Sequence, residues 1–328
     1  MQEMLSEKII EQVAHYSTKF AALKVEIGKV IVGHNFIIDS TLIAMLSKGH
    51  VLLEGVPGVA KTTLIKTIAD ALGLSFSRIQ FTPDLLPADL IGTLIYNPKL
   101  QEFETKKGPV FAHLILADEI NRSPAKVQSA LLEAMQERQV TIGSTTFELE
   151  EPFLVFATQN PIENEGTYQL PEAQIDRFMF KLYVGYPTFE QEREILHRSH
   201  RPLQVSKIIS RQDILDAQKI VQDIYVDARL VEYILKLVFA TREPEKYGLG
   251  SIAHMIQYGA SPRASIAITH ACKAYALLQN RHFVIPDDIK MVARGILRHR
   301  ILLTYHAQAE NITSDLIIDK IFDSITTP

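Results

Sequence analysis

The sequence predicts an α/β fold, in which a parallel sheet covered by helices on both faces is followed by a smaller, all-helical domain. Two observations lead to this prediction. Short apolar runs alternate with stretches of helical spacing in the first part of the chain, as is typical of parallel strands buried on both faces. After Gly185-Tyr186-Pro187 the pattern changes, and from about residue 212 the apolar spacing is helical nearly everywhere.

The individual elements follow from the same patterns. Strands are predicted at 50–54, 113–118, 153–158 and 178–184. Helices are predicted at 5–27, 36–47, 61–72, 124–137, 214–225, 228–241, 263–280 and 286–298. Residues 139–149 are predicted to form a hairpin around Gly143-Ser144, and 247–260, with three glycines, to form a loop. We expect an N-terminal helix at 1–27, an α/β core at 28–190 and a helical domain at 191–328.

Composition limits the function classes. A formal net charge of −4 over 328 residues provides no broad positive field, so no nucleic-acid partner is expected. The single cysteine, Cys272, excludes an internal disulfide and a cysteine-rich metal site. No apolar run approaches the roughly 18–20 residues of a membrane span, and charged residues interrupt the N-terminal segment. We therefore expect a cytoplasmic protein that does not insert into a membrane.

The first candidate site is Gly55-Val56-Pro57-Gly58-Val59-Ala60-Lys61-Thr62, between a predicted strand and a predicted helix. Phosphate binding at such a junction uses backbone N–H groups, a lysine for the outer phosphates and a hydroxyl for Mg²⁺. Lys61 and Thr62 have the required type and spacing, whereas Ala60 replaces the last glycine of the strict pattern. The alternative is a glycine-containing turn with a surface lysine.

Two acids, Asp118 and Glu119, end the apolar run 114–117. An aspartate at this position holds Mg²⁺ in P-loop NTPases, and a glutamate beside it can orient and polarise an attacking water. The alternative is a pair of acids capping the following helix. The spacing of about 56 residues from the glycine-rich segment favours the catalytic interpretation.

Three further polar residues are candidates. Asn160, at the end of another strand, could bind the water or the γ-phosphate, or could simply form an Asn-Pro turn. Arg177 could stabilise charge on the γ-phosphate, or pair locally with Asp176 or Glu172. Arg263, at the start of a C-terminal helix, could reach a phosphate or merely contact solvent.

The five motifs together resemble the MoxR branch of the AAA+ superfamily. The resemblance is carried by GVPGVAKT, LADEINR, ATQNP, LPEAQIDRF and GASPRAS and covers roughly residues 28–300. It implies a five-stranded parallel sheet flanked by helices, with the nucleotide between the sheet and a C-terminal helical lid. The family also has alanine at the position of Ala60. The segment 85–103 resembles an insertion that marks this clade, although its apolar residues could instead be a small satellite core.

The resemblance also implies a role for each matching residue. Asp118 and Thr62 would hold Mg²⁺, and Glu119, Asn160, Arg177 and Arg263 would act as Walker B glutamate, sensor 1, arginine finger and sensor 2. The ATP-binding residues would be Gly55, Val56, Pro57, Gly58, Val59, Ala60, Lys61, Thr62 and Thr63, with Ile31 and Val32 against the adenine. For Ile31 and Val32 the alternative is an apolar entry to the next helix.

The expected activity is Mg²⁺-dependent ATP hydrolysis in a homohexameric ring, in which Arg177 completes a neighbour's site. The resemblance implies a chaperone-like role on a protein client, with a partner that carries a von Willebrand factor A domain. The competing interpretations are a nucleic-acid translocase of the MCM or McrB type, the ATPase subunit of a metal chelatase, and a switch that binds ATP with hardly any hydrolysis.

Overall fold

A five-stranded parallel sheet forms the centre of the protein, as predicted. The computed structural model describes residues 2–56, 58, 59, 61–159, 168, 170–199 and 204–328. The strand order is β2-β5-β8-β1-β9, and every pairing in the sheet is parallel. The strands are β1 (Val51–Gly55), β2 (Phe76–Gln80), β5 (Leu114–Asp118), β8 (Leu154–Gln159) and β9 (Phe180–Val184).

Successive strand residues point to opposite sides of the sheet, so these apolar strands present buried side chains on both faces, and helices cover each face. Val51 and Leu53 of β1 belong to one hydrophobic cluster, which includes side chains of α1, α2, α3 and the C-terminal helices. Leu52 belongs to the other cluster, with α4 and α5. The helices of this part are α1 (Gln2–Val30), α2 (Asn35–Leu46), α3 (Lys61–Leu72), α4 (Pro87–Ile91), α5 (Ala125–Glu137), α6 (Glu172–Ile175) and α7 (Phe189–Ser199).

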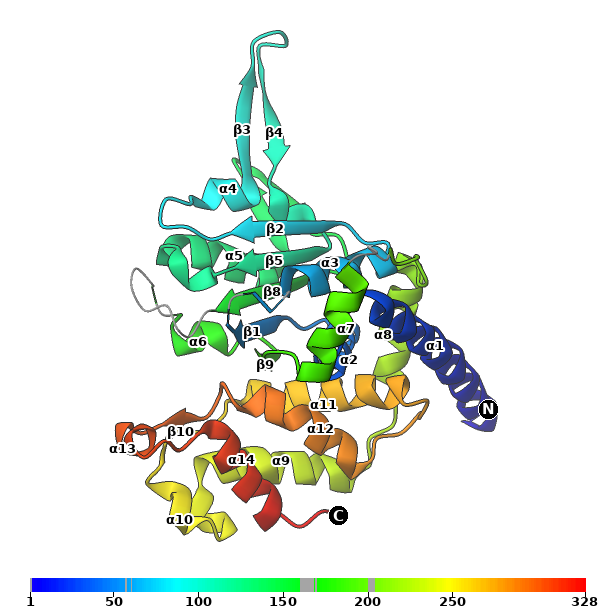
Figure 1. Cartoon of the computed structure of the whole chain (residues 1–328), viewed down its shortest axis with the longest axis vertical. Coiled ribbons are helices and arrows are strands. Elements are labelled where there is room, and N and C mark those ends of the chain that lie inside the picture. The colour runs from blue at the N-terminus through cyan, green and yellow to red at the C-terminus, as the bar shows by residue number, and fades with distance from the viewer. Residues whose placement is uncertain (1, 57, 60, 160–167, 169, 200–203) are drawn as a thin grey trace.

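The C-terminal part is a helical lid that lies next to the β9 edge of the sheet, at the bottom of Figure 1. Its contacts to the rest of the chain run chiefly from α8 and α11 to α1 and α2, and from α12 to β9. The elements from 204 onward are α8 (Arg211–Asp223), α9 (Ala228–Arg242), α10 (Gly250–Ala253), β10 (Ile256–Tyr258), α11 (Pro262–Leu278), α12 (Pro286–Leu297), β11 (Leu302–Leu303), α13 (Tyr305–Ala309) and α14 (Ser314–Ser324).

The prediction of a loop at 247–260 was wrong. The segment contains α10 and β10, and β10 pairs with the distant β11. Gly248 ends a short 3-10 helix with φ +73°, a conformation that favours glycine. Gly259 is required because a Cβ there would lie 2.4 Å from the Thr241 carbonyl oxygen. The pairing joins segments more than forty residues apart, so local spacing did not reveal it.

Both predicted domain boundaries fall inside helices. The boundary at 27/28 lies within α1, and the boundary at 190/191 lies within α7. A division in the connecting segments 31–34 and 185–188 keeps each helix whole, and we propose it in place of the predicted boundaries.

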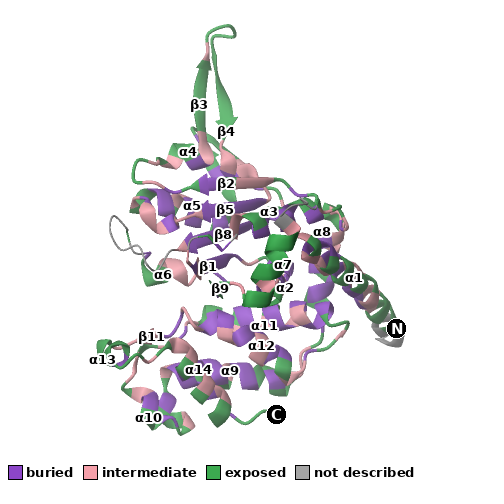
Figure 2. Ribbon diagram, viewed as in Figure 1, coloured by how far each residue is buried: buried purple, intermediate pink, exposed green. Residues whose placement is uncertain are grey.

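Two antiparallel hairpins stand outside the main sheet. One, β6 (Gln139–Ile142) with β7 (Thr145–Glu148), confirms the predicted hairpin. The other, β3 (Gly92–Asn97) with β4 (Glu102–Lys107), projects from the end of the molecule nearest β2 and is exposed along most of its length (Figures 1 and 2). It lies in the segment that resembles the clade insertion. Leu90 of that segment is buried, whereas Ile95 and Tyr96 are exposed, so only its base forms the satellite core.

His50, immediately before β1, is fully buried and uncharged. Its Nδ1 accepts a hydrogen bond from the Val155 N–H at 3.0 Å, and its Nε2 lies 3.2 Å from the Met135 carbonyl oxygen. Desolvation, and then the charge of Arg138, lower the pKa of His50 to about 3. The ring therefore stays neutral in the folded protein at pH values where the unfolded chain binds a proton.

We predict that His50→Gln flattens the dependence of stability on pH. Between pH 6.5 and 3 the unfolded state binds more protons than the folded state, so this histidine costs stability as the pH falls, by about 1.4 kcal/mol per pH unit. The free energy of unfolding in urea, measured at pH 7.5 and 5.5, should fall by about 1.4 kcal/mol less in the variant than in the wild type. His197→Gln, on the exposed face of α7, is the control and should retain the wild-type slope.

Candidate active site

The carboxyl ends of β1, β5 and β8 bring the predicted phosphate-binding segment and the two acids to one edge of the sheet. Gly55 ends β1, Lys61 begins α3, and Asp118 ends β5. Parallel strands place their carboxyl ends together, which is where ligands bind in open α/β sheets. The arrangement therefore joins residues that are more than fifty positions apart in the chain.

Packing and backbone conformation shape the turn between β1 and α3. Val59 is buried in the main hydrophobic cluster and Val56 packs against that cluster, so the turn is fixed to the core on both sides. Gly58 has φ +83°, which favours glycine, and is exposed with nothing close to where a Cβ would lie. A Cβ on Gly55 would lie 2.4 Å from the Val184 carbonyl oxygen, so β9 approaches the start of the turn closely. Pro57 and Ala60 lie outside the described residues.

Lys61 is oriented for an anionic ligand. Its Nζ donates a hydrogen bond to the Gly55 carbonyl oxygen at 2.7 Å, which leaves two of its three N–H donors for other acceptors. Burial lowers the pKa of Lys61, while the charges of Asp118 and Glu119 act in the opposite direction. Thr62 and Thr63, partly buried and exposed respectively, follow it in the first turn of α3, where backbone N–H groups have no helical partner. This donor set fits a polyphosphate.

Thr158, a buried residue of β8, holds the two acids in their relative positions. Its hydroxyl donates to Asp118 Oδ1 at 2.6 Å and accepts from the Glu119 N–H at 2.8 Å. Glu119 has φ +57° and ψ +50°, a left-handed conformation that costs energy for a residue with a side chain. The hydrogen bond from Glu119 to Thr158 compensates for part of this cost and fixes the direction in which the chain turns after β5.

Side chains from β2 and from the segment after β5 contact the same acids. Arg78 donates to Asp118 Oδ2 through Nη2 at 2.6 Å and Nε at 3.1 Å. Gln80 donates to Glu119 Oε2 at 2.9 Å, and Arg122 Nη1 lies 3.0 Å from the same oxygen. Asp118 and Thr62 provide a carboxylate and a hydroxyl, the oxygen ligands that Mg²⁺ prefers when phosphates complete its shell. The residues present therefore fit a magnesium nucleotide.

Arg177 and Arg263 lie together at the opposite edge of the sheet, where the amino ends of β1 and β9 meet. Both line a cavity of about 380 Å³ formed by residues 47–50 before β1, the end of α5, residues 176, 177 and 179 before β9, and α11. The strands rise roughly 3.3 Å per residue, so about 15 Å separates this edge from the carboxyl ends of the strands, where Lys61 and Asp118 lie. The structure therefore places the lid residue Arg263 with Arg177, and not beside Lys61 as a nucleotide between the sheet and the lid of one chain would require.

The cavity is strongly basic. Lys48, Arg138 and Arg300 line it with the two candidate arginines, and Asp176 is its only acidic lining residue in the described part of the chain. Arg177 Nε is buried and has no hydrogen-bond partner among the described residues. Asp176 pairs with Arg263 and Arg300 instead, so the local Asp176 partner considered for Arg177 is engaged elsewhere.

Known protein families match the sheet-containing part and the helical part of the chain separately. Residues 50–180 match the model of the ATPase family associated with various cellular activities, and residues 251–321 match that of the AAA lid domain. A protein named chaperone MoxR1, from Mycobacterium tuberculosis, is 52% identical over 304 residues, covering 92% of this chain and 81% of its own. The protein MoxR of Paracoccus denitrificans is 32% identical over 340 residues, covering 96% and 98%. The chain belongs to the MoxR-like family of AAA+ ATPases.

A crystal structure supports the MoxR-like fold. A candidate ATPase from Cytophaga hutchinsonii superimposes with a TM-score of 0.94 at 51% sequence identity, and the match covers 100% of both chains. The predicted family, the central sheet and the helical lid are thus confirmed. No helix in the described part of the chain is long and apolar enough to cross a membrane.

Some predicted site residues of this MoxR-like protein stay untested, and the structure adds others that the motifs did not indicate. Asn160 lies outside the described residues, and its predicted role stays a prediction. Ile31 and Val32 are both buried, next to the end of α1, and their contact with adenine also stays a prediction. The sequence motifs did not indicate Arg78, Gln80 and Thr158, which contact the acids from neighbouring strands. The motif ATQNP contains Thr158, but its hydroxyl reaches Asp118 only because β5 and β8 are adjacent in the sheet.

Proposed function

We propose that this MoxR-like ATPase hydrolyses ATP with Mg²⁺ at sites that two neighbouring subunits share in a homo-oligomeric ring, with six subunits as the expected number. One observation carries the proposal. Lys61, Asp118 and Glu119 lie at one edge of the sheet, whereas Arg177 and Arg263 lie at the other. A head-to-tail arrangement brings the two edges of adjacent subunits together.

At the P-loop edge, each residue has a distinct task. Lys61 and the free N–H groups at the start of α3 bind the phosphates, with Thr63 beside them. Thr62 and Asp118 would hold Mg²⁺, which supplies positive charge next to the transferred phosphoryl group. Glu119, held by Gln80 and by its backbone bond to Thr158, orients and polarises the attacking water. Ile31 and Val32 would contact the adenine.

At the opposite edge, the basic cavity supplies cations to the neighbour's γ-phosphate. The unpaired Nε of Arg177 supports this role, because a buried donor without an acceptor is costly unless a ligand provides one. Arg263 is half-exposed on the same cavity and would contact the same phosphate. In this arrangement the lid of one subunit contributes to the site of the next.

The principal test is Arg177→Ala. We expect turnover to fall by about 10³-fold or more, as for arginine fingers in other NTPases, while ATP affinity changes little, because the P-loop of the same chain is untouched. Steady-state hydrolysis and calorimetric ATP binding measure the two quantities. Arg229→Ala, at an exposed position on α9 remote from the cavity, is the control. Normal turnover of Arg177→Ala in dilute monomer would rule out the shared site.

We further propose that ATP hydrolysis drives the remodelling or activation of a protein client. In this role the ATPase works together with a partner that carries a von Willebrand factor A domain. The exposed β3–β4 hairpin supports a protein client. It presents the apolar side chains Leu94, Ile95, Tyr96, Leu100 and Phe103 to solvent. Its charged residues include both acids and lysines, which gives no uniform basic surface for a nucleic-acid backbone. The relative in Mycobacterium tuberculosis that is named a chaperone is consistent with this role.

A further inference from the structure

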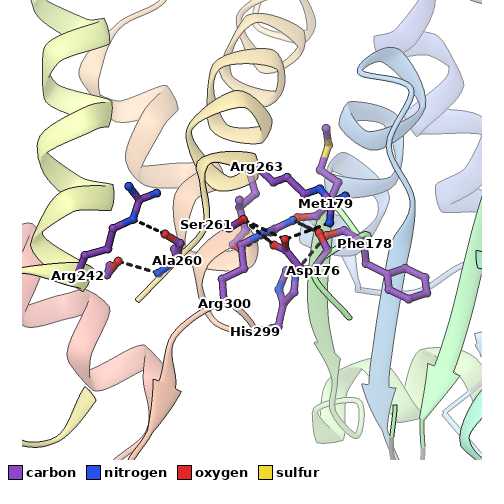
Figure 3. Close-up of polar contacts among 11 residues, drawn as sticks. Asp176, Phe178, Met179, Arg242, Ala260, Ser261, Arg263, His299 and Arg300 are labelled. Carbon is purple, nitrogen blue, oxygen red and sulfur yellow. Dashed lines mark hydrogen bonds and ion pairs between the residues drawn. The ribbon is translucent and has the colours of Figure 1, made fainter. Parts of the chain in front are cut away.

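Arg300 of the lid uses all five of its N–H donors, and four of the acceptors belong to the segment that carries Arg177. Its Nε donates to Asp176 Oδ1 at 2.7 Å, and its Nη2 donates to the carbonyl oxygens of Asp176 at 2.9 Å and Phe178 at 2.7 Å. Its Nη1 donates to the Met179 carbonyl oxygen at 3.1 Å and to that of Ile296 in α12. Only arginine has five donors in a planar fork. Figure 3 shows how the side chain reaches this segment.

Asp176 is held by the lid from a second direction. Its Oδ2 accepts from Ser261 Oγ at 2.9 Å and from Arg263 Nη1 at 3.4 Å, and both donors belong to the start of α11. His299, next to Arg300, has its Nε2 3.0 Å from the Phe178 carbonyl oxygen. Lid groups therefore bind the Asp176 carboxylate and the carbonyl oxygens of residues 176, 178 and 179 (Figure 3). The backbone N–H groups of 176–179 instead donate to carbonyl oxygens of α6 and of His50.

The start of α11 is itself fixed to the lid. The Ala260 N–H donates to Thr241 Oγ1 at 2.9 Å, and Arg242 Nε donates to the Ala260 carbonyl oxygen at 2.6 Å. Gly259 allows the backbone to approach α9 this closely. These hydrogen bonds hold Ser261 and Arg263 within the same helical lid that carries Arg300.

We propose that Arg300 and Asp176 are positioning residues, which make the orientation of the lid set the position of Arg177. Arg177 directly follows Asp176 in the chain, so a shift of the lid relative to β9 displaces it. Arg300 touches no nucleotide in this scheme and acts only through the segment that it holds. The inference rests on the proposed shared site, and it adds that hydrolysis by one subunit depends on the lid of its neighbour.

The variants are chosen because loss of a buried charge can unfold a protein. Arg300→Lys keeps the charge but provides three donors from a single nitrogen, and Asp176→Asn keeps the shape of the acceptor. Arg281→Lys is the matched control, since Arg281 and Asp288 form another largely buried ion pair of the lid, with an Nη1–Oδ2 distance of 2.7 Å, away from residues 176–179. All three variants should be verified as folded by circular dichroism and by thermal unfolding.

In steady-state hydrolysis, Arg300→Lys and Asp176→Asn should lower kcat at least tenfold, with the KM for ATP and the calorimetric affinity within about twofold of the wild type. Arg281→Lys should lower the unfolding temperature by about as much as Arg300→Lys does, but should leave kcat within twofold of the wild type. If kcat falls in proportion to the loss of thermal stability in all three variants, the role of Arg300 is only structural. Unchanged kcat in Arg300→Lys would also overturn the inference.

Mixing subunits separates a misplaced Arg177 from general damage. Lys61→Ala subunits bind no nucleotide but present a normal Arg177, so they should complete the site of an adjacent Arg300→Lys subunit. The mixture should hydrolyse ATP at least threefold faster than the sum of the separate variants. A mixture of Arg177→Ala with Lys61→Ala is the reference. Recovery in the reference but not with Arg300→Lys would refute the positioning role, whereas no recovery in the reference would refute the shared site itself.

Discussion

Lys61→Ala should abolish detectable ATP binding. In the structure the Lys61 ammonium is fixed on the Gly55 carbonyl oxygen at 2.7 Å, with its remaining donors available to the outer phosphates. Its replacement removes the positive charge closest to where those phosphates bind. We expect the affinity measured by calorimetry to weaken at least ~100-fold, which corresponds to about 2.7 kcal/mol.

The control is Lys66→Ala, on the exposed side of the same helix α3. It removes an equal charge from the same element and should leave ATP affinity unchanged. Equal affinity of Lys61→Ala and the wild type would mean that the turn between β1 and α3 is not a phosphate-binding loop. Circular dichroism should confirm that both variants remain folded, because the apolar face of α3 is not altered.

Glu119→Gln should stop hydrolysis while preserving nucleotide binding. Glutamine has the same shape as glutamate and can still pair with Gln80, but it lacks the negative charge that polarises the attacking water. We expect turnover to fall by at least ~100-fold, in the range that general-base catalysis contributes. ATP affinity should stay within a few fold of the wild type.

Single-turnover hydrolysis of bound ATP measures this loss directly. Glu133→Gln, on the exposed face of α5, should hydrolyse ATP at the wild-type rate. Equal, near-zero rates for the wild type and Glu119→Gln would indicate a nucleotide-binding switch in place of an ATPase. If turnover is lost as expected, the ATP-bound variant also provides a stable form for capturing the client.

The sequence was informative wherever chemistry is local in the chain. Gly55 to Thr62 and the Asp118-Glu119 pair are contiguous motifs, and the strands before them are continuous apolar runs. β2 was not recognised as a strand because it lies at the edge of the sheet, where Phe76–Gln80 is mostly half-buried or exposed. Its Arg78 and Gln80 reach the acids only because β2 pairs with β5. No pattern within β2 alone indicates that contact.

The second half of the site shows the same limit. Arg177 and Arg263 lie in motifs 86 residues apart, but their common cavity depends on how the lid packs against β9. Arg300 belongs to no motif, and its role follows from the carbonyl oxygens of 176–179, which the order of residues does not specify. Buried polar networks of this kind are set by tertiary structure.

The placement of Lys61 and Arg177 on opposite edges of the sheet also restricts the symmetry of any active assembly. A two-fold dimer makes each contact twice, residue i with j and j with i, so it completes both sites only when the two edges of a subunit lie within one interface patch. A heterologous contact joins two different patches, one at each edge, and such contacts either close into a cycle or continue as an open filament. In an open assembly the subunit at one end always lacks a donor of Arg177. Closure alone gives every bound nucleotide a complete set of catalytic groups, so specific activity should rise with protein concentration until the cycles are fully formed.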